Sequence, residues 1–165
     1  ETAAYAETSV CRRKMLMHYF GETYEQDNCG NCDNCVRPTT KIEGEKQLVV
    51  ALTSILAIKE NFRTDYVIDF VMGRETNEIV AHRHNQLEEF GSGEDFGEKI
   101  WNPLIRQALI AGYIKKEVEN YGLLKVTSEG KKFIKKPKSF MIVEDKEFVE
   151  YYNDFFSLHR LISLF

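Results

Sequence analysis

The pattern of hydrophobic and polar positions predicts helices along most of the first 111 residues. Apolar residues recur at intervals of three or four, which is the spacing of one buried face of an α-helix. This period runs through residues 3–20, 45–59, 66–72 and 95–111, and a shorter helix is expected near residues 84–90. The chain is therefore predicted to be mainly helical up to this point.

The pattern then changes to one that favours strands. Residues 113–119 and 123–127 are rich in β-favouring side chains, and Asn120-Tyr121-Gly122 between them suits a hairpin turn. Ser128 is expected to cap a last short helix over residues 129–134. Helices followed by a two-stranded ribbon are the order of a winged helix, which is a helix-turn-helix with a β wing. The predicted fold class is mainly α with a small β-wing.

All four cysteines of the chain lie in one short stretch near its start. Cys11 is followed, after seventeen residues, by Cys29, Cys32 and Cys35, which are separated by two residues each. Two-residue gaps let successive sulfurs turn onto one centre, and Cys11 can complete a tetrahedral site of the kind that structural zinc prefers. We expect these four cysteines to bind one structural Zn²⁺ ion, with Cys11 in the middle of the first helix.

Three other uses of the cysteines are possible. Two disulfides would suit a secreted domain, but no signal peptide is visible. A redox CxxC pair would need a βαβ setting that the pattern does not predict. An iron–sulfur cluster also takes four cysteine ligands, and the spacing alone does not distinguish it from zinc.

The chain divides into three predicted parts. Residues 1–40 form a zinc-bound helical module, and Pro38 lies in the short linker that follows it. Residues 41–138 form the winged-helix domain. Residues 139–165 form a linker or tail that starts with a short extended segment over residues 139–143. The tail is rich in aromatic residues, so it can pack on this chain, begin a further domain or mediate self-association.

Composition and charge fit a globular protein with a local basic surface. The chain of 165 residues is 43% hydrophobic and 29% charged, and it has no apolar run of membrane-spanning length, so we expect a cytoplasmic protein without membrane contact. Its net charge is −4. Within residues 115–138, however, eight lysines stand against three glutamates. Phosphate binding needs only such a local basic face.

Two sequence segments carry a resemblance to a known family. Residues 4–22, AYAETSVCRRKMLMHYFGE, followed by CGNCDNC at residues 29–35, resemble the zinc-binding region of bacterial-type RecQ-family DNA helicases. Residues 47–136 are similar to the winged-helix RQC domain that follows the zinc-binding region in that family. The matching pieces are VMGR, FGSG, GYI and LKVT. The resemblance covers residues 3–136.

The resemblance implies an accessory region of an ATP-dependent 3′–5′ DNA helicase that acts in recombination, repair and the SOS response at the bacterial nucleoid. The family's G-x-x-x-x-G-K-[ST] phosphate loop does not occur in this sequence. We therefore expect this fragment to be inactive alone, with ATP and Mg²⁺ bound only in motor domains outside it. The tail would lead toward the family's HRDC module.

DNA contacts are expected mainly to the phosphate backbone, because a helicase has to ignore sequence. Loops before helices present amide groups to phosphate, and the wing carries lysines and an aromatic tip that can stack as a wedge. Acidic residues next to the loop candidates would repel phosphate and so disfavour DNA contact there. The candidate DNA-binding residues are Arg74, Thr76, Ser92, Lys115, Lys116, Tyr121, Lys125, Arg12 and Arg13.

Several other side chains have simpler expected roles. Trp101 lies on an apolar helix face and is predicted to be in the core. Arg106 suits a salt bridge as well as a DNA contact. His82 and His84 are expected at the surface or as caps, since four cysteines already complete a zinc site.

Two alternative functions remain open from the residues. One is a protein-interaction module, in which the lysine-rich region binds the acidic tail of single-stranded DNA-binding protein. The other is a metal-dependent winged-helix transcription regulator, which would bind DNA sequence-specifically. The interpretation as a helicase region predicts weak, salt-sensitive and sequence-independent binding to duplex, fork or junction DNA.

Overall fold

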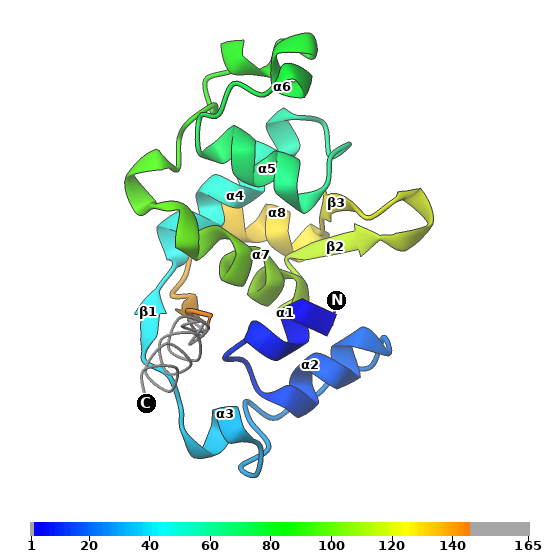
Figure 1. Cartoon of the computed structure of the whole chain (residues 1–165), viewed down its shortest axis with the longest axis vertical. Helices are drawn as coiled ribbons and strands as arrows, with labels where there is room; N and C mark the ends of the chain where they lie inside the picture. Colours follow the sequence, from blue (N-terminus) through cyan, green and yellow to red (C-terminus); the bar gives the residue numbers. More distant parts are fainter. Residues whose placement is uncertain (1, 146–165) are drawn as a thin grey trace, which may run out of the picture.

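Four helices enclose the main hydrophobic core of residues 2–145, the part of the chain that the computed structural model describes (Figure 1). They are α4 (Glu45–Ala57), α5 (Thr64–Val71), α7 (Trp101–Ile110) and α8 (Ser128–Lys135). Trp101 is fully buried at the centre, where its indole N–H donates to Met72 Sδ at 3.1 Å. The expected core position of Trp101 is confirmed, as is the mainly helical fold class.

Helix α4 shows why these segments fold as helices. Leu48, Ala51, Leu52 and Ile55 recur at three- and four-residue intervals, and all four side chains have no exposed surface. Burial of this stripe against α5, α7 and α8 stabilises the helix in the folded protein. Helix α7 begins later than predicted, because the residues before it form two 3₁₀ turns, η2 (Glu94–Phe96) and η3 (Glu98–Ile100), with Gly97 at φ +77° between them.

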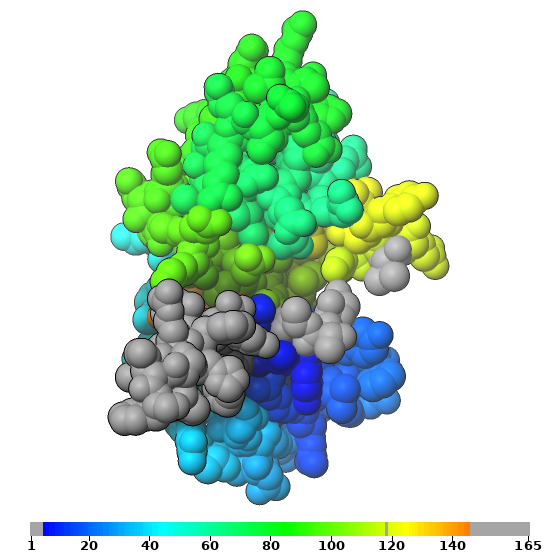
Figure 2. Space-filling model, in the orientation of Figure 1, coloured from blue at the N-terminus to red at the C-terminus, as the bar shows by residue number. Residues whose placement is uncertain are grey.

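The predicted hairpin is present. Strands β2 (Ile114–Glu117) and β3 (Leu123–Val126) pair antiparallel, with Lys115 opposite Lys125. The turn consists of the short 3₁₀ helix η4 (Val118–Asn120) and two left-handed residues, Tyr121 and Gly122. In Figure 2 this wing projects from the body of the molecule.

A second small sheet joins distant parts of the chain. Strand β1 (Lys41–Glu43) pairs antiparallel with β4 (Met141–Val143), which confirms the expected extended segment. Glu43 strengthens the join: its carboxylate accepts hydrogen bonds from Ser139 Oγ (2.7 Å) and from the backbone N–H of Phe140 (2.9 Å). Residues 139–143 therefore lie against the start of the winged-helix segment.

The first predicted helix is divided in two, so its prediction as one helix is wrong. Helix α1 (Thr2–Glu7) ends at a break, and α2 (Arg12–Tyr19) starts directly after Cys11. At the break the Val10 N–H donates to Thr8 Oγ1 at 3.1 Å, a local side-chain bond that competes with helix. Cys11 thus lies before a helix and not in the middle of one.

Three further details differ from the sequence prediction. Helix α6 (Asn77–Ala81) lies in a stretch where no helix is predicted; Thr76 caps it by accepting a hydrogen bond from the Ile79 N–H at 3.3 Å. The expected helix at 84–90 is only the 3₁₀ turn η1 (His84–Gln86). Thr127 rather than Ser128 caps α8. Within residues 2–145, none of the helices combines the length and the apolar character needed to cross a bilayer.

Candidate metal centre and DNA interface

The four cysteine sulfurs come together at the start of the chain. All four Sγ atoms lie within 4.8 Å of one another, with Cys32 and Cys35 at 3.3 Å and Cys29 and Cys35 at 3.9 Å. A tetrahedral zinc site with Zn–S bonds of about 2.3 Å has its sulfurs about 3.8 Å apart. The cluster therefore has the size and donor set of a four-cysteine zinc site. No disulfide joins these residues, contrary to the disulfide alternative.

The local backbone explains how the sulfurs converge. Gly30 adopts a left-handed conformation (φ +71°) that turns the chain after Cys29. Cys32 then begins the short helix α3 (Asp33–Val36), and Cys35 lies three residues on, which places both on one face. Backbone N–H groups of Asn31 and Cys32 lower the pKa of Cys29 to about 6. A thiolate, the form that binds metal, is thus favoured there.

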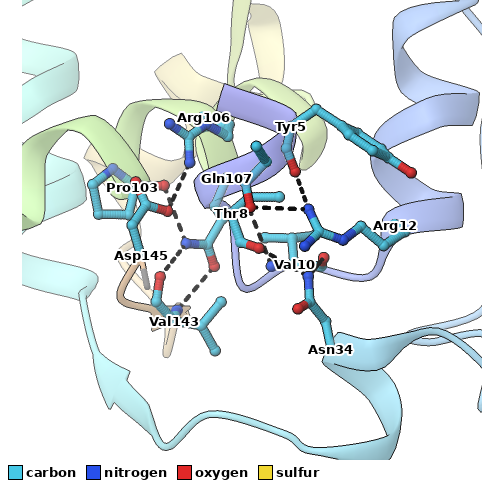
Figure 3. A network of polar contacts seen from close by, with 11 residues as sticks. Tyr5, Thr8, Val10, Arg12, Asn34, Pro103, Arg106, Gln107, Val143 and Asp145 are labelled. Atoms are coloured by element: carbon cyan, nitrogen blue, oxygen red, sulfur yellow. Dashed lines mark hydrogen bonds and ion pairs between the residues drawn. The ribbon is translucent and has the colours of Figure 1, made fainter. Parts of the chain in front are cut away.

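A buried carboxamide fastens the cluster to the N-terminal helices. Asn34 donates from Nδ2 to the carbonyl oxygens of Thr8 (2.8 Å) and Val10 (2.7 Å), and it is only 5% exposed (Figure 3). It thereby links α3 to the break between α1 and α2. Asn34 is not among the residues predicted from the sequence. The pattern that could have indicated its role is an amide side chain between two cysteines of the cluster.

Arg12 is engaged within the protein. Its guanidinium forms two 3.0 Å hydrogen bonds to the Asp33 carboxylate. It also donates to the Tyr5 carbonyl oxygen (Figure 3). The guanidinium carbon also lies 5.1 Å from the centre of the Tyr5 ring. The neighbouring Arg13 is exposed. Of the two arginines considered for phosphate contact, Arg13 is the accessible one.

Polar contacts also fix the end of the described chain to α7. The Gln107 carboxamide pairs with the backbone of Val143, donating to its oxygen at 2.7 Å and accepting from its N–H at 3.0 Å (Figure 3). Arg106 forms an ion pair with Asp145 at 2.7 Å. The salt-bridge alternative for Arg106 is therefore confirmed.

The loop candidates for DNA contact are only partly accessible. Arg74 forms ion pairs with Asp69 (3.1 Å) and Glu98 (2.6 Å). Thr76 uses its hydroxyl to cap α6. Ser92 is exposed beside Gly93. These interactions leave Ser92 as the most accessible of the three predicted loop residues.

The wing candidates lie together on one hairpin. Tyr121 at the tip is 91% exposed, the largest exposed fraction among the large apolar and aromatic side chains described within residues 5–145. Lys115 and Lys116 are exposed on β2, and Lys125 is half-buried on β3 directly opposite Lys115. Lys115 lies 3.8 Å from Glu117, so part of its charge is offset. The structure thus brings four of the nine predicted DNA-binding residues onto one projecting element.

Comparison with known proteins identifies the family. Residues 38–150 match the RQC domain family model. The chain belongs to the RQC-domain family. Residues 1–36 of this RQC chain also match the RecQ zinc-binding model, which includes all four cysteines. The expected resemblance to RecQ-family helicases is confirmed.

Two bacterial relatives of the RQC chain are both named ATP-dependent DNA helicase RecQ. It is 32% identical over 132 residues to the ATP-dependent DNA helicase RecQ of Pasteurella multocida (strain Pm70), covering 79% of this chain and 21% of the relative. It is 30% identical over 132 residues to the protein of that name from Haemophilus influenzae (strain ATCC 51907 / DSM 11121 / KW20 / Rd), with the same coverage of each chain. The RQC chain thus spans about a fifth of the length of these relatives. The zinc-binding match and the sulfur cluster together fit structural zinc better than an iron–sulfur cluster.

Proposed function

We propose that this RQC chain is the accessory DNA-binding region of a RecQ-type helicase, which unwinds DNA from 3′ to 5′ with ATP. The names of its relatives support this reading. ATP and Mg²⁺ would be bound by motor domains elsewhere in the parent protein, since this sequence has no phosphate loop. The parent would act in repair and recombination in the bacterial cytoplasm, at the nucleoid.

The wing is the observation that carries the proposal. It places an exposed aromatic ring, Tyr121, at the tip of a hairpin that carries Lys115, Lys116 and Lys125. Lysine side chains attract phosphates without reading bases, and an aromatic ring stacks on the end of a duplex whatever its sequence. The wing would therefore grip a duplex end, fork or junction independently of sequence.

The zinc site would have a mechanical role in this function. Zn²⁺ held by Cys11, Cys29, Cys32 and Cys35 would supply a closed structural cross-link, with no open position for a catalytic water. Residues 1–40 would then be one rigid zinc-binding module, joined to a winged-helix domain over residues 41–138. Residues 139–165 would connect it to a further, HRDC-like module.

A second candidate partner has its own observation. Lys131, Lys132, Lys135 and Lys136 are exposed along α8 and its end, directly after the wing in the sequence. Such a basic helix suits the acidic tail of single-stranded DNA-binding protein. The family match favours a region of a RecQ-type helicase over a metal-sensing transcription regulator.

Fluorescence anisotropy with unrelated forked duplexes at two salt concentrations tests the proposal, with zinc content measured on the same sample. We expect binding that ignores sequence, weakens with salt and accompanies one zinc per chain. Tyr121→Ala should weaken binding, whereas Tyr19→Ala, which removes another exposed tyrosine on α2, should not. Failure of zinc-loaded protein to bind any probe would disprove the DNA-binding function.

A further inference from the structure

A hollow lies beside strand β3 of the wing and has no role in the function described so far. It encloses about 560 Å³ and is lined by the loop from α4 to α5, the end of α6 and Leu123 at the start of β3. This volume falls in the range of small-molecule sites, which is about 300–1,000 Å³. A single nucleotide is of the size that such a site accommodates.

The floor of the hollow is fixed to the wing. Lys59 and Glu60 both adopt left-handed backbone conformations (φ +60° and +56°), which are uncommon for residues other than glycine. The Glu60 carboxylate accepts a hydrogen bond from the Val126 N–H at 2.8 Å, and the Phe62 carbonyl accepts one from the Leu124 N–H at 3.0 Å. Both donors are on β3. The hollow and the wing are therefore parts of one rigid unit.

Aromatic rings form one wall. Phe62 stacks on Tyr66 with ring centres 3.8 Å apart, and the rings of His82 and His84 stand edge-on to Phe62 at 5.1 and 5.2 Å. Burial raises the pKa of Tyr66 to about 12 and lowers the pKa of His84. The Tyr66 hydroxyl and His84 Nδ1 are joined by a hydrogen bond of 2.6 Å. His84 is fixed in place, while His82 is exposed at the rim and offers a planar ring to a ligand.

The remaining wall carries charges that do not neutralise one another. Within residues 2–145, the side chains of Lys59 and Arg63 form no ion pair, and the carboxylates of Asp65 and Glu78 accept no hydrogen bond. The hollow thus combines free cations, free acceptors and an aromatic surface. Its ligand should carry a negative charge, N–H donors and a flat ring.

A simple anion or a metal ion fits less well. Asp65 and Glu78 repel an isolated phosphate. Among the described residues, the only cluster with metal-ligand spacing is the four-cysteine site. A nucleotide satisfies all three requirements, because it has a phosphate for Lys59 and Arg63, base N–H groups for the carboxylates and a π-face for His82.

We propose that this hollow binds one unpaired nucleotide of a DNA strand adjacent to the duplex end that the wing contacts. Its base would stack on His82, and its phosphate would pair with Arg63 and Lys59. The inference rests on the proposed function, since the wing has to hold a duplex end for the neighbouring nucleotide to reach the hollow. The hollow would thus bind the separated strand, in addition to the contact that the wing makes with the duplex.

The test measures the affinity of the full chain for a blunt duplex and for the same duplex with a short 3′ or 5′ extension. We expect one extension to tighten binding by about fivefold or more, which is the lower limit for stacking on one base. An abasic site at the first unpaired position should remove this gain, because it keeps the phosphates but deletes the base. Arg63→Ala and His82→Ala should also remove it, while His82→Phe, which keeps a planar ring, should retain it.

Binding to the blunt duplex separates this inference from the proposed function. Arg63→Ala should change blunt-duplex affinity only as much as Lys46→Ala, which deletes an exposed charge at the opposite end of α4. The inference is overturned if neither extension tightens binding, if the abasic probe keeps the gain, or if the gain survives both pocket substitutions. If the wild-type chain binds no blunt duplex, the proposed function fails first and the inference fails with it.

Discussion

The carboxamide of Asn34 holds the metal centre to the rest of the N-terminal helices. Its two hydrogen bonds reach the carbonyl oxygens of Thr8 and Val10, which would otherwise be left without donors at the break between α1 and α2. The ion pair of Arg12 with Asp33 is a second link between α2 and α3. At the residue scale, the position of Cys11 relative to the other three ligands therefore depends on side chains that are not themselves ligands.

Replacement of Asn34 should loosen the zinc site. Asn34→Ala leaves two buried carbonyl groups unpaired, and we expect a loss of about 1–3 kcal/mol in the stability of residues 1–40. The measurement is the rate of zinc transfer to a colorimetric chelator, which should rise. Asn31→Ala is the matched control, because this exposed asparagine lies in the same loop. Equal transfer rates for the two variants would contradict the assigned role of Asn34.

Removal of a wing lysine should change the salt dependence of DNA binding. Lys115 is exposed on β2, and a lysine that contacts one phosphate adds about one counterion to the binding equilibrium. We expect Lys115→Ala to weaken binding equally for unrelated sequences and to reduce the slope of log K against log salt by about one. A substitution that altered sequence preference instead would indicate base contact.

At the scale of elements, α8 shows a conflict between helix propensity and packing. Alanine is normally a better helix former than glycine by about 1 kcal/mol. At Gly130, however, an added Cβ would lie 2.3 Å from the Tyr113 carbonyl oxygen and 2.7 Å from Val126. The carbonyl belongs to the backbone just before β2, so it cannot rotate away. Glycine at this position allows α8 to approach the wing.

Gly130→Ala should therefore destabilise the protein despite its favourable propensity. We expect the free energy of unfolding to fall by about 1–3 kcal/mol, the usual cost of overpacking. Denaturant unfolding followed by Trp101 fluorescence measures it. Lys131→Ala, on the exposed side of the same helix, should leave the stability nearly unchanged. If both variants are as stable as the wild type, α8 packs less closely than the distances indicate.

The β1–β4 sheet should weaken in acid through Glu43. Hydrogen bonds from the Ser139 hydroxyl, and then from the Phe140 N–H, lower the pKa of Glu43 below its ordinary value of 4.5. A lowered pKa means that Glu43 adds stability above about pH 4.5 and that this contribution disappears as the carboxylate is protonated on acidification.

Glu43→Gln should thus be less stable than the wild type at pH 7, and the difference should shrink as the pH falls below 4.5. Denaturant unfolding at a series of pH values measures this convergence. Glu88→Gln removes an exposed carboxylate outside the sheet and serves as the control. A difference that stayed constant with pH would show that Glu43 does not act through its charge.

The helices that could be predicted from sequence are those with several buried positions in phase. Leu48, Leu52 and Ile55 in α4 form such a set. Helix α6 buries only Ile79 and depends on the Thr76 cap, so its periodicity was too short to detect. The break before Cys11 depends on Thr8 and on a hydrogen bond from Asn34, 26 residues away, which no local pattern contains.

At the scale of the whole molecule, two parts differ in what stabilises them. Among buried apolar side chains in the described part of the chain, only Cys11 and Met15 precede residue 40. The other buried apolar residues form the core around Trp101. We therefore expect residues 1–40 to need a cross-link in order to fold, and zinc bound to the four cysteines would supply the missing free energy.

Chelation should consequently unfold one part of the molecule before the other. We expect treatment with a strong zinc chelator to reduce the helical circular dichroism and to expose residues 1–40 to protease. The emission of Trp101, which is the single tryptophan of the chain, should stay unchanged. A shift of this emission to longer wavelength on chelation would show instead that the winged-helix core also depends on the metal.

The cysteine ligands and the wing were predictable because each is carried by a short, local pattern: cysteine spacing in one case and a turn between β-favouring runs in the other. The accessibility of the predicted DNA-contacting residues could not be predicted. Arg12 and Arg74 resemble free cations in the sequence, but Asp33 and Glu98 reach them only through the fold. Charge pairing between distant residues has no signature in a single sequence.

The antiparallel pairing of β1 with β4 has a mechanical consequence. Lys41 lies opposite Val143, so the chain enters and leaves the winged-helix body at the same place. Tension between segments attached before Lys41 and after Val143 would open this sheet from its Lys41–Val143 end, breaking its hydrogen bonds one after another. The same tension would load the contacts of Val143 with Gln107 and of Asp145 with Arg106, so α7 would share the force with the sheet. The sheet and these two side chains would thus act together as the clamp that holds both ends of the winged-helix body.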